Sequence, residues 1–180
     1  MSINRFNSGM SNPIIIVDYD SQWPEMFMEL RARIATVLED LAAAIEHVGS
    51  TAVPGLAAKP VIDIDVLLSS SDGLPQAIER LASLGYAHRG DLGVAGRDAF
   101  RQPFGQPAHH LYVCPPDSIE YRRHIEFRDH LRAYPESARR YVELKRNLAA
   151  EFRNDRERYN TGKTEFVDKI VRSVLRPRLK

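Results

Sequence analysis

The sequence predicts an α+β protein with a small mixed β-sheet, helices on one side of it, and a C-terminal helical region. Two short apolar segments, residues 43–48 and 60–68, have the length and composition of buried strands, and a turn of small residues separates them. Helical periodicity precedes them and continues from residue 118 to the C-terminus. The order of elements lacks the regular strand–helix alternation of a doubly wound parallel sheet, which favours the α+β class.

A single domain accounts for the 180 residues, because this length is sufficient for one well-packed core. Residues 1–12 are polar and rich in Asn, Ser and Gly, so we predict a disordered tail. Met10 is an alternative start, in which case residues 1–9 contribute nothing. The domain then spans residues 13–180, and residues 118–180 are its helical part.

The first helix begins near Pro24, after a cap at Asp20 or Ser21. Its apolar residues recur every three or four positions and predict one buried stripe: Phe27, Leu30, Ile34, Leu38 and Leu41. A second helix is predicted over residues 74–84 and ends at Gly85. Further strands are predicted at three places: residues 86–89, 98–102 and 109–114.

The pattern of apolar residues in the C-terminal region predicts three helices. Pro135 separates the first from the second, whose stripe comprises Tyr141, Leu144, Leu148 and Phe152. The segment Asn160-Thr161-Gly162 is expected to break the chain before the last helix.

Composition is that of an ordinary globular protein, with 43% hydrophobic and 27% charged residues. The single Cys114 excludes an internal disulfide and predicts a buried, reduced thiol. No apolar run approaches the roughly 18 residues of a membrane span. We therefore expect a cytoplasmic protein without a membrane partner.

The small net charge of +1 conceals an asymmetry, because residues 1–118 have a net charge of −6 and residues 119–180 a net charge of +7. A basic helical region beside an acidic one could bind a polyphosphate. For most of these residues we favour the simpler interpretation of exposed helix faces with ion pairs at helical spacing.

Asp63 and Asp65 occupy alternate positions of an apolar strand, so their side chains project from one face. Neighbouring carboxylates repel each other, and a cation between them relieves the repulsion. Oxygen ligands of this kind suit magnesium, or manganese as an alternative. Acidic residues also mark exposed edge strands, but the apolar flanks favour a central strand. We therefore predict a metal site at these two aspartates.

A phosphate-binding turn is predicted just before this strand, at Gly49, Ser50 and Thr51. Free backbone N–H groups and a hydroxyl are the groups that bind a phosphate, and the same groups can cap a short helical segment. Arg97 is a further phosphate candidate, because arginine binds phosphate in a bidentate fork. Lys59 is either a phosphate contact or a surface lysine.

Three histidines lie near these motifs. His47 lies on an apolar strand, where a hydrogen-bonded structural histidine is more common than a catalytic one. His109 and His110 project from opposite faces of their strand, so one of them at most can face the aspartates.

Residues 46–64, EHVGSTAVPGLAAKPVIDI, closely resemble the signature of the GrpB family, also called UPF0157. The similarity covers nearly the whole chain after the tail and includes these further segments: Tyr19-Asp20, Trp23-Pro24, Gly96-Arg97 with Phe100, His109-His110-Leu111, Phe127-Arg128-Asp129, Leu131-Arg132, Tyr141 and Leu144-Lys145. The resemblance implies a nucleotidyltransferase-like fold of the polymerase-β type.

In that superfamily a Gly-Ser turn is followed by an acidic pair on the next strand and by a third acid on a later strand. The resemblance therefore implies that Asp63 and Asp65 hold one or two magnesium ions, which align and neutralise a triphosphate. The later strand here, residues 109–114, has no acid. His110 could take that place as a ligand or base, and Asp98 on the preceding strand is a possible substitute.

Two functions follow as hypotheses. The first is a magnesium-dependent nucleotidyltransferase that transfers a nucleotidyl group from an NTP to an unknown acceptor, with Asp63, Asp65 and His110 as catalytic residues. The alternative is a catalytically inactive module that binds a nucleotide or a coenzyme A precursor and regulates or assists a partner protein. RNA binding through the basic helices is a third, less favoured hypothesis.

Overall fold

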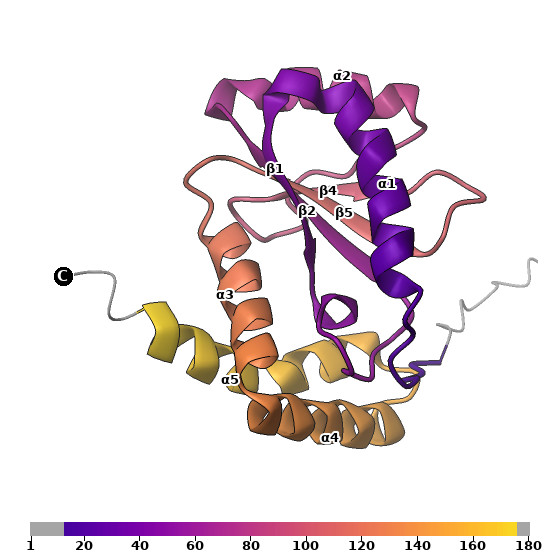
Figure 1. The fold of residues 1–180 in the computed structure, drawn as a ribbon, viewed down its shortest axis with the longest axis vertical. Coiled ribbons are helices and arrows are strands. Elements are labelled where there is room, and N and C mark those ends of the chain that lie inside the picture. Colours follow the sequence, from indigo (N-terminus) through magenta and orange to yellow (C-terminus); the bar gives the residue numbers. More distant parts are fainter. Residues whose placement is uncertain (1–12, 176–180) are drawn as a thin grey trace, which may run out of the picture.

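The computed structural model describes residues 13–175, so the predicted tail lies outside the described residues. The strands are β1 (Ala42–Val48), β2 (Ile62–Leu68), β3 (Ala87–His88), β4 (Asp98–Arg101) and β5 (His109–Cys114). The helices are α1 (Trp23–Leu38), α2 (Leu74–Ser83), α3 (Ile119–Ala133), α4 (Pro135–Glu151) and α5 (Arg156–Leu175). This arrangement confirms the predicted α+β class with a C-terminal helical region (Figure 1).

The five strands of the described chain form one mixed sheet in the order β1-β2-β5-β4-β3. Strand β2 pairs antiparallel with β1 and parallel with β5, while β4 pairs antiparallel with both β5 and β3. The aspartate strand β2 therefore has a neighbour on each side, as its apolar flanks predicted.

One face of the sheet forms the main core. On β2, Ile62, Ile64 and Val66 point to this face and pack with the buried stripe of α1 and with residues of α2. The residues of α1 in this core are Trp23, Phe27, Leu30, Ile34 and Leu38. Because side chains alternate along a strand, Asp63 and Asp65 point to the opposite face.

Helix α3 covers the aspartate face, so helices lie on both sides of the sheet and the predicted one-sided arrangement was incomplete. The contacts of α3 with the sheet are polar: His124 bonds Asp65, and Arg128 bonds Glu46 of β1. The periodicity of apolar residues does not reveal polar contacts of this kind. It therefore did not indicate that α3 forms a second helical layer.

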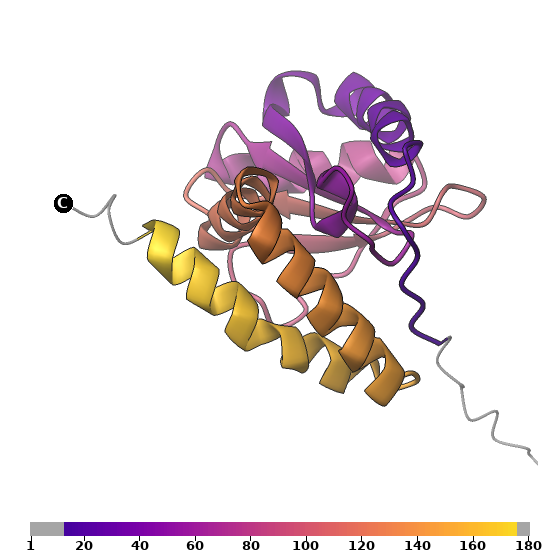
Figure 2. The ribbon, with the colours of Figure 1, turned by 60° about the horizontal axis from the view of Figure 1, so that its bottom comes forward.

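The predicted chain break at residues 160–162 was wrong, because α5 runs through them without interruption. Helices α4 and α5 lie side by side (Figure 2). Gly162 faces α4 so closely that a Cβ atom there would lie 2.5 Å from Leu148 Cδ2. The glycine thus permits close packing of the two helices rather than ending one of them.

No helix in residues 13–175 is both long and apolar enough to cross a membrane.

Candidate active site

Asp63 and Asp65 differ sharply in exposure, although they share one face of β2. The side chain of Asp65 is fully buried, with 0% exposure, whereas that of Asp63 retains 31%. In the parallel pairing of β2 with β5, Asp63 lies opposite His110 and Asp65 lies opposite Tyr112. The sheet register therefore brings His110 to the aspartates, as the sequence predicted for one of the two adjacent histidines.

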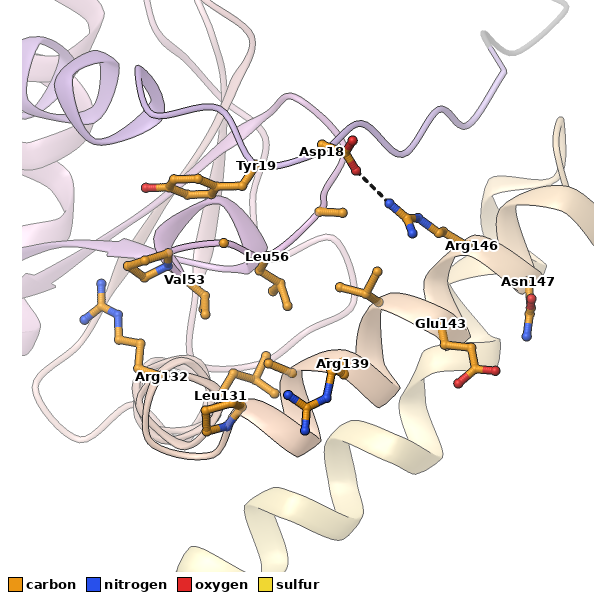
Figure 3. A pocket seen from close by; sticks show the side chains of 16 residues that line it. Asp18, Tyr19, Val53, Leu56, Leu131, Arg132, Arg139, Glu143, Arg146 and Asn147 are labelled. Atoms are coloured by element: carbon orange, nitrogen blue, oxygen red, sulfur yellow. Dashed lines mark hydrogen bonds and ion pairs between the residues drawn. The ribbon is translucent and has the colours of Figure 1, made fainter.

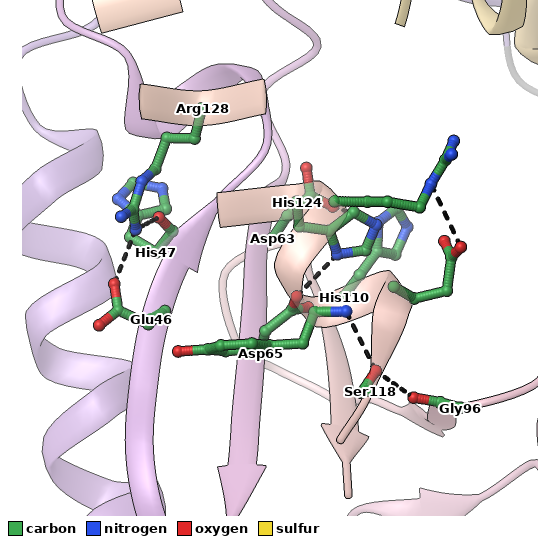
Figure 4. A network of polar contacts seen from close by, with 12 residues as sticks. Glu46, His47, Asp63, Asp65, Gly96, His110, Ser118, His124 and Arg128 are labelled. Carbon is green, nitrogen blue, oxygen red and sulfur yellow. Dashed lines mark hydrogen bonds and ion pairs between the residues drawn. The ribbon is translucent and has the colours of Figure 1, made fainter. Parts of the chain in front are cut away.

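Each aspartate forms a hydrogen bond with its own histidine (Figure 4). His110 Nδ1 lies 2.8 Å from Asp63 Oδ1, and His124 Nδ1 of α3 lies 2.7 Å from Asp65 Oδ2. The sequence analysis missed His124, which is 59 residues away from its partner along the chain. The repulsion expected between the two carboxylates is thus offset by two imidazole rings.

The pKa values of both members of the buried Asp65–His124 pair are raised. Burial raises the pKa of Asp65 above its usual value. Burial acts to lower the pKa of His124, but the hydrogen bond and the charge of Asp65 together outweigh it, so that the pKa of His124 is raised. The second oxygen of this carboxylate, Asp65 Oδ1, is buried and has no hydrogen-bond partner among the described residues.

The turn before β2 is shaped around Asp63. Gly49 has a φ of +70°, which only glycine adopts readily. A Cβ atom at Gly49 would lie 2.2 Å from Asp63 Oδ2, so the carboxylate occupies the space that a side chain would need. The turn therefore requires glycine both for its backbone conformation and for close contact with the aspartate.

Substitution of Gly49 by alanine is expected to lower the free energy of unfolding by about 3 kcal/mol, from backbone strain and displacement of the carboxylate. Gly55→Ala is the matched control, because Gly55 has a φ of +77° but a Cβ atom there would meet nothing within 4 Å. In Gly55→Ala the free energy of unfolding should fall by only about 1 kcal/mol. Equal losses in urea unfolding of the two variants would show that the contact with Asp63 contributes nothing.

Lys145 of α4 reaches the predicted phosphate turn from the helical region. Its Nζ donates hydrogen bonds to Ser50 Oγ at 3.0 Å and to the carbonyl oxygen of Ala57 at 2.5 Å. The residue is only 2% exposed. A buried ammonium group is therefore held directly beside the hydroxyl that the sequence assigned to phosphate binding.

A cavity of about 500 Å³ opens beside this turn and the aspartate face. Five basic side chains line it: Lys59, Arg97, Lys145, Arg156 and Lys163. The turn residues Gly49, Ser50 and Thr51 also line it, together with Asp63, His110 and His124. The fold thus gathers the candidate residues of the sequence analysis in one place, except for the buried Asp65, and adds basic residues from α4 and α5.

The three lysines of the cavity have no ion pair with a carboxylate within residues 13–175. Two of them lie near tyrosines of their own helices, with Lys145 Nζ 4.8 Å from the ring centroid of Tyr141 and Lys163 Nζ 4.4 Å from that of Tyr159. Lys59 Nζ lies 5.1 Å from the same Tyr159 ring. The lysines therefore concentrate basic groups around the cavity, where Asp63 is an acid that acts on all three of them without forming an ion pair.

Burial is the main cause of lowered lysine pKa values in this cavity, and repulsion by neighbouring lysines and arginines adds to it. The pKa of Lys145 falls to about 7 and that of Lys163 to about 8, and the pKa of Lys59 is also lowered. A bound anion would favour the protonated amines and reverse these shifts.

The free energy of unfolding is expected to rise between about pH 7 and pH 10 because of Lys145. The unfolded chain binds a proton at this amine with the ordinary pKa of 10.5, whereas the folded chain releases it at about 7. The unfolded state therefore binds more protons in this range, and stability increases with pH. Lys145→Met should weaken this rise in denaturant unfolding across the range. Lys169 is an exposed lysine of the neighbouring helix, so Lys169→Met should leave the rise in stability with pH unchanged.

Arg97 also lines the cavity, next to Tyr112. Its guanidinium group lies 4.2 Å from the ring centroid of Tyr112. Its Nε is buried and has no hydrogen-bond partner among the described residues. Because this nitrogen is buried, an anion could bond it only after a movement of the side chain.

Other candidate residues of the sequence have structural roles. His47 lies 3.0 Å from Thr51 Oγ1 and stacks on Phe27, and burial lowers its pKa to about 4, which agrees with the structural interpretation. The Thr51 hydroxyl also donates to the carbonyl oxygen of Val61, so it is engaged within the fold. Asp98 lies opposite Val113 in the sheet, on the face away from Tyr112, and it bonds His88 instead. It therefore does not supply a third acid.

A larger cleft of about 1070 Å³ lies between residues 53–57 and α4 (Figure 3). Neither Asp63 and Asp65 nor the phosphate turn at residues 49–51 line this cleft. Its rim arginines have acidic partners, since Arg146 bonds Asp18 at 2.7 Å and Arg139 bonds Glu136. These pairs agree with the interpretation that most helical charges are ion-paired surface residues.

Comparison with known proteins agrees with this geometry. Residues 13–173 match the family described as GrpB protein. The chain is 36% identical to the UPF0157 protein YqkA of Bacillus subtilis over 152 residues, which are 84% of this chain but 44% of that protein. It is 37% identical to a UPF0157 protein of Pseudomonas aeruginosa over 175 residues, covering 95% of this chain and 72% of that protein.

A solved structure shows the same fold. The crystal structure of the conserved protein GrpB from Enterococcus faecalis superposes with a TM-score of 0.81 at 30% sequence identity. The match covers 92% of this chain and 100% of that chain. The fold, with a Gly-Ser turn against the aspartate strand of a mixed sheet, is therefore shared with a solved GrpB protein. The resemblance found in the sequence is confirmed, and the chain belongs to the GrpB family.

Proposed function

We propose that the cavity binds the phosphates of a nucleoside triphosphate and that the protein transfers the nucleotidyl group to an acceptor. The observation that supports this most directly is the group of three lysines, without carboxylate partners, beside the Gly49–Ser50 turn. Gathering like charges in a partly buried cavity is unfavourable unless an anion neutralises them. A triphosphate supplies several negative charges at once.

The dimensions and chemistry of the cavity fit such a ligand. A volume of about 500 Å³ lies within the range of small-molecule sites. The turn offers backbone N–H groups and the Ser50 hydroxyl, while the lysines offer point charges, and both suit phosphate oxygens. Arg97 adds a guanidinium group to the lining of the cavity. The ligand would thus contact lysine and arginine side chains together.

Magnesium at Asp63 and Asp65 is what the family resemblance implies, and the side chains as placed do not fit that ion. Each carboxylate has one oxygen held by an imidazole. The remaining oxygen of Asp65 is buried, and Asp63 Oδ2 packs against Gly49. Within residues 13–175 no group of three His, Cys, Asp or Glu side chains is arranged to hold a metal ion. Magnesium therefore stays a prediction, on which the proposed binding of phosphate does not depend.

The second candidate function is binding without transfer. The protein would bind a nucleotide or a coenzyme A precursor and regulate or assist a partner protein. One observation favours it: β5 supplies no third carboxylate to the aspartate face, where it presents His110 and Tyr112. A basic cavity without the acids of the metal site would still bind a polyphosphate.

Thermal unfolding against nucleoside triphosphates and coenzyme A precursors, each with and without magnesium or manganese, tests the proposal. A ligand that binds the native state raises the unfolding midpoint by mass action. We expect a triphosphate to raise it in the wild type and in Lys169→Met, and to have little effect in a Lys145→Met/Lys163→Met double variant. If no nucleotide or precursor raises the wild-type midpoint, with or without metal, the proposal is wrong.

A further inference from the structure

We propose that the stack of Arg97 on Tyr112 is the platform on which the base of the bound nucleotide lies, and that this base is a purine. The inference deepens the proposed function and rests on it, because it assumes that the phosphates occupy the cavity. It gives Arg97 a role different from the phosphate contact that the sequence analysis predicted.

The Arg97 side chain presents a flat surface to the cavity. Its guanidinium carbon lies 4.2 Å from the ring centroid of Tyr112, so one face of the guanidinium group rests on this ring. Both side chains line the cavity and are partly exposed. The part of Arg97 that remains for a ligand is therefore the opposite face of the plane and its terminal amino groups. Bases stack on guanidinium planes as they do on aromatic rings, and such a contact does not need the buried Nε.

The platform is fixed before a ligand binds. The carbonyl oxygen of Gly96, next to Arg97, accepts a hydrogen bond of 2.5 Å from the Ser118 hydroxyl (Figure 4). The same hydroxyl accepts a bond from the backbone N–H of Tyr121, so the link before β4 is tied to the start of α3. Tyr112 lies within β5, between β2 and β4. A rigid platform loses little conformational entropy when a base stacks on it.

The tyrosines on the helical side of the cavity already contact other side chains. Tyr141 stacks on Phe166, with ring centroids 5.2 Å apart and an interplanar angle of 21°, and it meets Phe127 edge-on. The ring of Tyr159 has the ammonium groups of two lysines at 4.4 Å and 5.1 Å from its centroid. A base that stacked on either tyrosine would have to displace these partners. Arg97 requires no such displacement.

Arg97 lies apart from the lysines that would hold the phosphates. Neighbouring lysines and arginines lower the pKa values of the three cavity lysines, but Arg97 is not among the charges that do so. It lies against Tyr112 of the sheet, whereas Lys145 and Lys163 come from α4 and α5. A nucleotide with its phosphates among the lysines can therefore place its base on Arg97.

A flat platform of this kind favours the larger bases. Where base edges are not read by hydrogen bonds, stacking strength sets the preference among bases. A purine covers the guanidinium plane more completely than a pyrimidine does. We therefore expect the wild type to bind ATP and GTP more tightly than UTP and CTP.

Titration calorimetry with ATP and with inorganic triphosphate tests the platform, because inorganic triphosphate has no base. Arg97→Lys retains the charge and removes the plane. We expect it to weaken ATP binding by at least about 5-fold, the lower end of measured stacking contributions, and to leave the affinity for inorganic triphosphate unchanged. Retained binding of inorganic triphosphate shows that the variant is folded. Arg101→Lys is the matched control, because Arg101 is an exposed arginine of β4 outside the cavity.

Three results would overturn the inference. The first is an unchanged affinity of Arg97→Lys for ATP, or equal losses with ATP and inorganic triphosphate at an unchanged unfolding midpoint. The second is a loss of ATP affinity in His110→Ala alone, which would place the base on that exposed imidazole. The third needs no variant: equal affinities of the wild type for ATP and UTP. If the wild type binds neither ATP nor inorganic triphosphate, the proposed function itself is wrong.

Discussion

Replacement of Lys145 by methionine is expected to lower the affinity for a nucleoside triphosphate by about 10- to 100-fold. A hydrogen bond to a charged group contributes about 1.5–3 kcal/mol, and tenfold in affinity corresponds to about 1.4 kcal/mol. Lys145 is 2% exposed and bonds Ser50, so its ammonium group is fixed at the phosphate turn rather than free in solvent. Methionine retains the length of the side chain and removes the charge.

Isothermal titration of the nucleotide that gives the largest thermal shift measures this effect. Lys169→Met is the control, because it removes one lysine from an exposed position of α5 and changes the net charge equally. Similar losses of affinity in the two variants would mean that only the overall charge of the helical region attracts the nucleotide. The cavity would then not be the binding site.

Replacement of Asp65 by alanine is expected to lower the free energy of unfolding by about 3 kcal/mol, because it leaves His124 without its partner inside the protein. Asp63→Ala is the matched control on the same strand. Its pair with His110 is partly exposed, so the loss should stay below about 1 kcal/mol.

Urea unfolding of the two aspartate variants decides between two accounts of the strand. If Asp65→Ala is much less stable than Asp63→Ala, each carboxylate is stabilised by its own imidazole. If Asp65→Ala is more stable than the wild type, repulsion between the carboxylates dominates. That result would favour the original prediction that a cation lies between them.

The sequence predicted the strand part of the site well, because strand geometry is local. The alternation of side chains placed Asp63 and Asp65 on one face and separated His109 from His110, and the apolar flanks indicated a central strand. His109 is indeed buried on the other face, where it bonds Tyr86 and the carbonyl oxygen of Pro107. These conclusions needed only the period of a strand.

The helical part of the site was not predicted, because it depends on contacts between distant segments. Lys145 meets Ser50 across 95 residues of sequence, and no local pattern specifies how α4 lies on the turn. A signal was nevertheless present: Lys145 follows the buried Tyr141 by four positions, and Lys163 follows the buried Tyr159 by four. A lysine at this spacing lies on the apolar stripe of its helix, where a surface residue is not expected.

Proton uptake on nucleotide binding tests most directly whether a polyphosphate reaches the cavity lysines. At about pH 8, Lys145 and Lys163 are partly neutral in the free protein, since their pKa values are lowered to about 7 and about 8. A bound triphosphate should raise these pKa values, so binding should take up protons. Titration calorimetry in two buffers with different heats of ionisation should give different apparent enthalpies, and the difference should diminish in Lys145→Met. Equal enthalpies in the two buffers, or no binding at all, would contradict this account of the site.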